Sequence, residues 1–108
     1  MPLFIDDGYT LEFSIPERPG IHEAITGHRR PTTAKQRIRF WHKFDDLSAD
    51  EKFDRYVTII CSQIVDWSIQ KPLKPETFTN MGFEAFDSLT TEALKGYEAI
   101  DEKNSSKA

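Results

Sequence analysis

Apolar residues recur at steps of three and four from Ser48 to Trp67, and this spacing predicts one long helix over the whole stretch. Ser48 and Glu51 have the spacing of a capping box, in which a hydroxyl and a carboxylate accept hydrogen bonds from backbone N–H groups of the first turn. Because the apolar stripe is wide, we expect this helix to lie at the centre of the core. The stripe comprises Phe53, Tyr56, Val57, Ile60, Ile64 and Trp67, widened by Ile59, Cys61 and Val65.

A period of two replaces the helical period near the start of the chain. Apolar and polar residues alternate from Tyr9 to Ile15, as in a half-buried strand, and the prolines and glycine of Pro16–Gly20 end the run. A weaker strand is expected over Ile21–Arg29, where the acidic Glu23 shares a face with two isoleucines and leaves the pairing register open. The two strands predict an N-terminal hairpin, which is marginal alone and must pack on helices.

A helix is also expected before the central one. Thr32 or Thr33 can cap it, and it should end near Phe44. The short link 45–47 favours an antiparallel pair with the central helix. The predicted inward stripe of this helix is Ala34, Ile38, Trp41 and Phe44, with Arg37, Arg39 and Lys43 pointing outward.

The last third of the chain predicts a short helical turn and a final helix. Pro72 ends the preceding structure, and Pro75 can open a turn or two that stop before Gly82. Gly96 interrupts the final helix and can end it early. The inward stripe of the final helix is predicted as Phe83, Phe86, Leu89, Ala93, Tyr97 and Ile100.

These elements predict an α+β fold, mostly α, with an N-terminal β-hairpin packed on three to four helices. The chain has 108 residues, of which 38% are hydrophobic, and this length suits one domain with one modest core. We expect that domain to span residues 1–101. Residues 102–108 are polar and are expected to form a disordered tail.

Composition points to a cytoplasmic protein. No apolar run approaches the roughly 20 residues needed to cross a bilayer. The apolar start Met1–Ile5 is followed at once by Asp6 and Asp7, which does not resemble a signal peptide. A single cysteine, Cys61, excludes an internal disulfide, and its place among isoleucines favours a small buried hydrophobe over a reactive thiol.

The usual patterns of catalytic and cofactor chemistry are not found in the sequence. His22, His28 and His42 lie neither three nor four residues from another histidine or from the cysteine, so two metal ligands on one helix face are not expected. The five glycines are isolated and form no phosphate-binding loop. We therefore expect no metal, cofactor or nucleotide, and we do not expect an enzyme.

Charge is strongly segregated along the chain. Residues 24–44 contain six bases and no acid, whereas the segments before and after them carry net charges of −4 and −6. This basic block could contact phosphates while Phe40 or Trp41 stacks on bases, or it could meet an acidic protein partner or a sister subunit. We favour protein contact and hold a small nucleic-acid-binding or regulatory protein to be the weaker alternative, because the sequence pI is about 5.3 and Trp41 lies on the predicted inward stripe. The bases are Arg29, Arg30, Lys35, Arg37, Arg39 and Lys43.

A dense apolar cluster surrounds Gly82. It could pack in the core against the central helix, or it could form an apolar groove for a partner helix, since Met and Phe side chains adapt to varied helices. Core packing is favoured, and both interpretations stay open. The members of the cluster are Phe78, Met81, Phe83 and Phe86.

Two stretches carry a family resemblance that covers about residues 20–100. Arg30-Pro31 follows a short strand and precedes a helix, and the stretch I-V-D-W-S-I at 64–69 is followed by P-L-K-P-E-T-F-T-N-M at 72–81. This arrangement resembles the small tail assembly chaperones of long-tailed phages and prophages, in which a helix commonly ends in a tryptophan-containing turn.

The resemblance implies a protein that is not catalytic. Such chaperones bind the long, aggregation-prone tape measure protein and keep it soluble while tail tube subunits assemble around it, often as oligomers. The implied partner is therefore a tape-measure-like helical protein. The resemblance assigns no site residue, so the apolar cluster around Gly82 supplies the candidate contacts.

Overall fold

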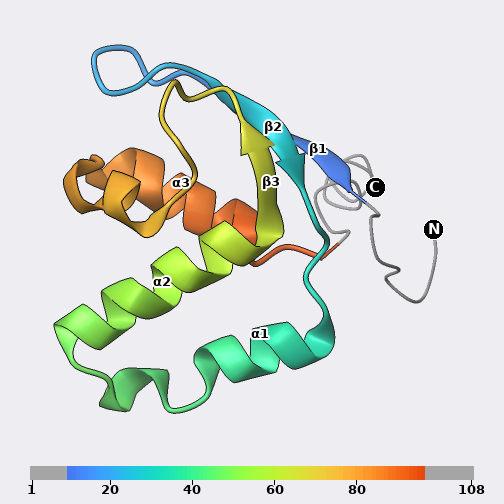
Figure 1. The fold of residues 1–108 in the computed structure, drawn as a ribbon, viewed down its shortest axis with the longest axis vertical. Helices are drawn as coiled ribbons and strands as arrows, with labels where there is room; N and C mark the ends of the chain where they lie inside the picture. Colours follow the sequence, from blue (N-terminus) through green and yellow to red (C-terminus); the bar gives the residue numbers. More distant parts are fainter. Residues whose placement is uncertain (1–9, 97–108) are drawn as a thin grey trace, which may run out of the picture.

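Residues 10–96, the part of the chain that the computed structural model describes, form a three-stranded antiparallel sheet with helices packed against it (Figure 1). The strand order is β1-β2-β3, with β2 in the middle. The elements in chain order are β1 (Leu11–Ile15), β2 (Ile25–Arg29), α1 (Ala34–Trp41), the 3-10 turn η1 (Phe44–Asp46), α2 (Ala49–Gln63), β3 (Ile64–Trp67), the 3-10 helix η2 (Pro75–Asn80) and α3 (Phe83–Ala93). The expected α+β class, mostly α, is confirmed.

The predicted hairpin is present, but its second strand is shorter than expected. β1 pairs with β2 from Leu11 opposite Arg29 to Ile15 opposite Ile25. Residues 21–24 belong instead to the hairpin loop, where Ile21 is 55% exposed. The loop turns at Pro19 and Gly20. Gly20 has a φ of 78°, which glycine adopts without strain, and the Ile21 N–H donates to the Arg18 carbonyl at 2.8 Å.

The expectation of one helix from Ser48 to Trp67 is wrong at its C-terminal end. α2 begins with the predicted capping box of Ser48 and Glu51 but stops at Gln63, and Ile64–Trp67 forms β3 beside β2. Three of the four residues in β3 are β-branched or aromatic, types that favour strands. Gly27 of β2 permits the approach of β3, because a Cβ at this position would lie 2.1 Å from the Asp66 carbonyl oxygen.

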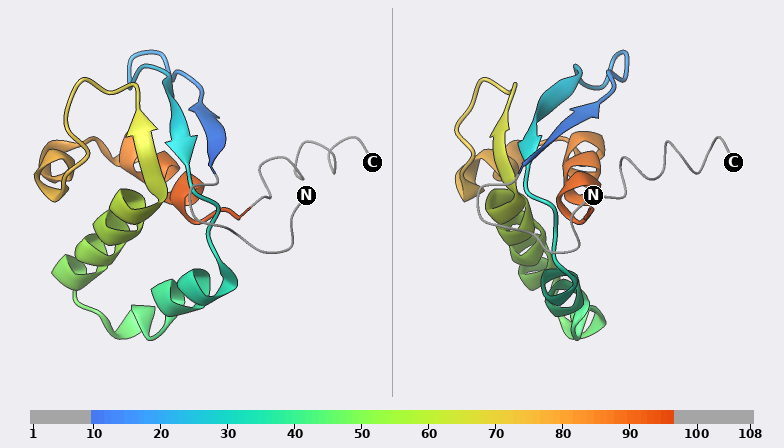
Figure 2. Two further views of the ribbon diagram at one scale, coloured as in Figure 1. Left: turned by 45° about the vertical axis from the view of Figure 1, so that its right-hand side comes forward. Right: turned by 90° about the vertical axis from the view of Figure 1, so that its right-hand side faces the viewer.

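The core lies between one face of the sheet and the two long helices, and α3 crosses that face (Figure 2). Phe13, Ile15 and Ile25 contribute from the hairpin, and Ile60 of α2 and Leu89 of α3 are completely buried. The remaining core residues are Phe40, Val57, Ile59, Ile64, Phe78 and Ala93.

The predicted inward stripe of the first helix is wrong, because most of it faces solvent. α1 runs back beneath α2 in roughly the opposite direction (Figure 1), but Ile38 is 69% exposed and Trp41 is 51% exposed. Phe40 is the buried residue of α1. Ala34 is exposed and Phe44, in η1, is half-buried.

The predicted inward stripe of the final helix is wrong at its first residue. Pro75 opens η2 at its first turn, as expected, and α3 ends at Ala93, before Gly96. Phe83 was expected to face inward and is 73% exposed, because it is the first residue of α3 and lies beyond the packed part of the helix. Tyr9, Tyr97, Ile100 and the tail 102–108 lie outside the described residues.

Replacing Ile60 with alanine should lower the free energy of unfolding by about 2–5 kcal/mol, the range for truncating a fully buried aliphatic side chain. The same change at Ile38, on α1, is the matched control and should alter stability by less than about 0.5 kcal/mol. Urea unfolding of both variants measures the difference. Equal losses at the two positions would contradict the assignment of inner and outer helix faces.

Candidate functional site

The cluster around Gly82 is divided between the core and the surface. Phe78 is 1% exposed, and its ring centroid lies 5.6 Å from that of Trp67 and 6.0 Å from that of Phe86. Phe86 in turn stacks on Phe53 of α2 at 5.4 Å. Met81 is half-buried against the core, which leaves Phe83 as the exposed member. The four side chains therefore do not line a shared apolar groove.

Arg29 is a structural residue and not part of an exposed basic patch. Its side chain is fully buried, and its Nη1 donates to the carbonyls of Lys95 and Gly96 at 2.8 Å each. Its Nε lies 3.6 Å from the Glu92 carboxylate, which also receives a hydrogen bond from the Lys95 ammonium at 3.0 Å. This arrangement ties β2 to the end of α3 and places the guanidinium out of reach of an external phosphate.

The other five bases of the block lie on exposed residues in and around α1. Arg37 is partly committed, because its Nε donates to the Leu94 carbonyl at 3.1 Å and its Nη2 contacts the same oxygen. The set comprises Arg30, Lys35, Arg37, Arg39 and Lys43.

Ala34, Ile38 and Trp41 lie at positions i, i+4 and i+7 of α1 and form an exposed apolar stripe, here called the α1 outer face. The Trp41 ring packs edge-on against Phe40 at 4.8 Å and Phe44 at 5.2 Å. These contacts fix the ring while half of the residue remains accessible.

The opposite side of α1 is fastened to the rest of the domain. A capping box between Thr33 and Gln36 begins the helix, and the Gln36 amide donates to the Gln63 side chain at 3.0 Å. At the other end, the Arg55 guanidinium donates to the carbonyls of Phe40 and His42 at 2.7 Å each. The helix is thus held at both ends with its outer face directed to solvent.

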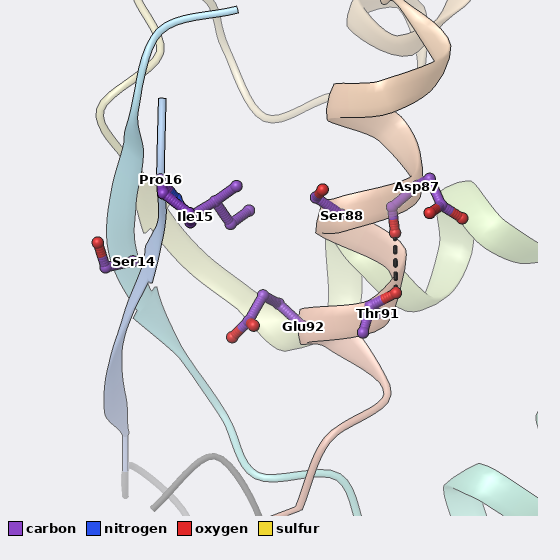
Figure 3. Close-up of a pocket in the computed structure, with 7 residues that line it drawn as sticks. All are labelled: Ser14, Ile15, Pro16, Asp87, Ser88, Thr91 and Glu92. Atoms are coloured by element: carbon purple, nitrogen blue, oxygen red, sulfur yellow. Dashed lines mark hydrogen bonds between the residues drawn. The ribbon is translucent and has the colours of Figure 1, made fainter. Parts of the chain in front are cut away.

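A small open cleft of about 190 Å³ lies between the end of β1 and α3 (Figure 3). The Thr91 hydroxyl on its wall donates to the Asp87 carbonyl at 3.1 Å, and Glu92 is engaged with Arg29 and Lys95. No histidine or cysteine is among the residues that line it, so the cleft offers its hydroxyls no imidazole or thiolate base. The lining comprises Ser14, Ile15, Pro16, Asp87, Ser88, Thr91 and Glu92.

His28 and Cys61, which lie outside these surfaces, have shifted pKa values. The hydrogen bond that His28 Nδ1 donates to the Asp66 carboxylate at 2.9 Å, and then the negative charge of the same carboxylate, raise the pKa of His28. Protonated His28 therefore favours the folded state, and this contribution is lost as the pH rises from about 6.5 through the raised pKa. Burial, and then the charge of Glu76, raise the pKa of the Cys61 thiol, which keeps it protonated near neutral pH.

Within residues 10–96, no three His, Cys, Asp or Glu side chains gather where they could hold a metal ion. No helix among these residues is long and apolar enough to span a membrane.

Replacing Arg29 with methionine should destabilise the domain by about 3–5 kcal/mol, because it leaves the Glu92 carboxylate and the carbonyls of Lys95 and Gly96 without their buried partner. Arg30→Met is the matched control, since the neighbouring side chain is exposed, and should change stability by less than about 0.5 kcal/mol. Thermal and urea unfolding measure both. A mild effect at Arg29 would contradict its structural role.

Comparisons of the chain with protein-family models, with curated proteins and with solved structures found no match. The resemblance to tail assembly chaperones therefore stays a prediction, and the candidate site is defined by its geometry, as the α1 outer face and its basic surroundings.

Proposed function

We propose that the protein is a non-catalytic adaptor that binds a partner protein through the α1 outer face. The observation that carries the proposal is the exposure of Ile38 and Trp41, at 69% and 51%, on a helix whose opposite side is fastened to the domain. An apolar stripe at helical spacing is the surface with which helices pack on one another. Exposed apolar patches rimmed by polar residues mark interaction sites, and tryptophan is enriched among the residues that dominate binding.

The charges around the stripe define the chemistry of the partner. Lys35 and Arg39 are exposed on α1, and Lys43 follows it, with no acid in residues 24–44. A partner helix that presents an apolar stripe between acidic residues would match both the shape and the potential of this face. The charges would speed the encounter, and the apolar contacts would supply most of the affinity.

A tail assembly chaperone is the specific form of this function that the sequence resemblance supports. In that form, the protein acts in the cytoplasm, and the α1 outer face covers apolar segments of a tape-measure-like helical protein until tube subunits replace it. The contact residues we propose are then Ile38 and Trp41, with Phe83 as a second exposed apolar position.

Photo-crosslinking tests the proposed surface directly. We expect a benzoylphenylalanine at position 38 of the full chain to capture one defined protein in the producing cells, at a helical segment with acidic residues beside apolar ones. The probe at position 12, on the exposed face of β1, is the control and should not capture it. Trp41→Glu in the position-38 protein should abolish the adduct while its circular dichroism is unchanged. The same adducts at positions 38 and 12 would contradict the proposal.

The chaperone form has its own test. Co-expression with a tape measure protein from the same genome should keep that protein soluble, and Ile38→Glu should cause it to precipitate. Ile21→Glu is the control. It makes the same isoleucine-to-glutamate change at an exposed position of the hairpin loop and should have no effect. Equal solubility with and without the protein would exclude this form and leave the adaptor proposal in place.

Nucleic-acid binding is a second candidate, favoured by the exposure of Trp41 beside basic residues. We rank it below protein binding for three reasons: Arg29 is buried, the α1 outer face contains the aliphatic Ile38, and the chain is acidic overall. Fluorescence anisotropy with duplex and single-stranded DNA should show weak binding that disappears by about 200 mM salt. Tight binding that persists there and is lost in the double variant Lys35→Glu, Arg39→Glu would place nucleic acid first.

A further inference from the structure

We infer that copies of this protein join head to tail, with the α1 outer face of one copy docked on the exposed start of α3 in the next. The inference rests on the proposed function in one respect, namely that the α1 outer face is a protein-binding surface. It adds the identity of one partner, a second copy of this chain.

The start of α3 has the chemistry that the α1 outer face requires. Residues 75–94 contain four acids and no base, the reverse of residues 24–44 with six bases and no acid. Phe83 is 73% exposed at the first position of α3, and Asp87, one turn further along, is exposed as well. Glu84 is half-buried beside them, and Glu76 is exposed on η2. The exposed Phe83 ring, with the carboxylates of Glu84 and Asp87 on the same helix, thus complements an apolar stripe on a helix that carries exposed ammonium and guanidinium groups.

Charge favours the contact between the α1 outer face and the α3 start over a symmetric contact between two identical faces. Two α1 outer faces packed together would bring two basic helices close to one another, each with exposed Lys35 and Arg39 and followed by Lys43. Two α3 starts would likewise oppose Glu84 and Asp87. Like charges brought together at an interface cost several kcal/mol, whereas the unlike pairing places opposite charges in contact. The contact between unlike faces is therefore the favoured one.

The two faces cannot meet within one molecule. α2 lies between α1 and the start of α3 (Figures 1 and 2). Arg37 of α1 bonds to the carbonyl of Leu94, at the far end of α3, and Phe83 is eleven residues before Leu94, about 16 Å along the helix. Each copy thus presents one face of each kind. A contact between unlike faces leaves one of each at the ends of the assembly, so copies form a ring or an open chain.

Sedimentation velocity on the full-length protein tests the inference. The wild-type mass should rise above the 12.5 kDa monomer as concentration increases, and it should fall again as salt is added. Ile38→Glu, which disables the α1 outer face, and Phe83→Lys, which disables the α3 start, should each be monomeric. Ile21→Glu, at an exposed isoleucine outside both faces, is the control and should assemble like the wild type.

Mixing the two disabled variants gives the decisive result. Ile38→Glu keeps an intact α3 start and Phe83→Lys keeps an intact α1 outer face, so an equimolar mixture should contain a dimer with one copy of each and nothing larger. A wild type that stays monomeric at every concentration, a mixture that stays monomeric, or assembly of either variant alone would overturn the inference. A monomeric wild type that still gives the position-38 adduct with another protein would overturn it and leave the proposed function standing.

Discussion

The position of α1 depends on the buried polar contacts of the segment 29–32, which joins β2 to that helix. Arg29 donates to the carbonyls of Lys95 and Gly96, just after α3, and the Thr32 hydroxyl donates to the Ala93 carbonyl at 2.5 Å. The buried Gln63 amide, at the end of α2, donates to the Arg30 carbonyl and to the Thr32 hydroxyl, both at 3.2 Å. A buried polar group is costly unless it is paired, so these mutual contacts fix the segment to the ends of both long helices.

The outward direction of the apolar stripe follows from this attachment. Gln36 is on the side of α1 that reaches Gln63, and Phe40, one turn later on the same side, enters the core. Ile38 lies between these two in sequence and therefore faces away from α2. Arg55 then holds the C-terminal carbonyls of α1, so the helix cannot rotate to bury the stripe without breaking contacts at both ends. The exposed face is thus a consequence of the fold and not a loosely packed surface.

Local pattern was enough to predict the hairpin, the Ser48 cap, the turn at Pro75 and the α+β class, because each depends on neighbours in the sequence. It failed at Ile64–Trp67, where the helical period continues by coincidence and pairing with β2, more than 30 residues away, decides the structure. It also failed at α1, since periodicity identifies a stripe but not what covers it. The side of α1 that faces the domain carries Gln36 and Phe40, which are four residues apart and therefore on one face of the helix. The burial of Arg29 depends on contacts 66 and 67 residues away, which no local pattern reveals.

Folding brings part of the segregated charge together inside the domain. Glu92 lies close to Arg29 from the basic block, and this contact joins two oppositely charged segments inside the domain. The bases on α1 and the acids at the start of α3 stay on separate parts of the surface, with α2 between them. At physiological salt the Debye length is about 8 Å, so charges a helix length apart are largely screened from one another within the molecule. Their attraction becomes substantial only when a second surface brings such groups into contact, which is why the charge pattern concerns association more than stability.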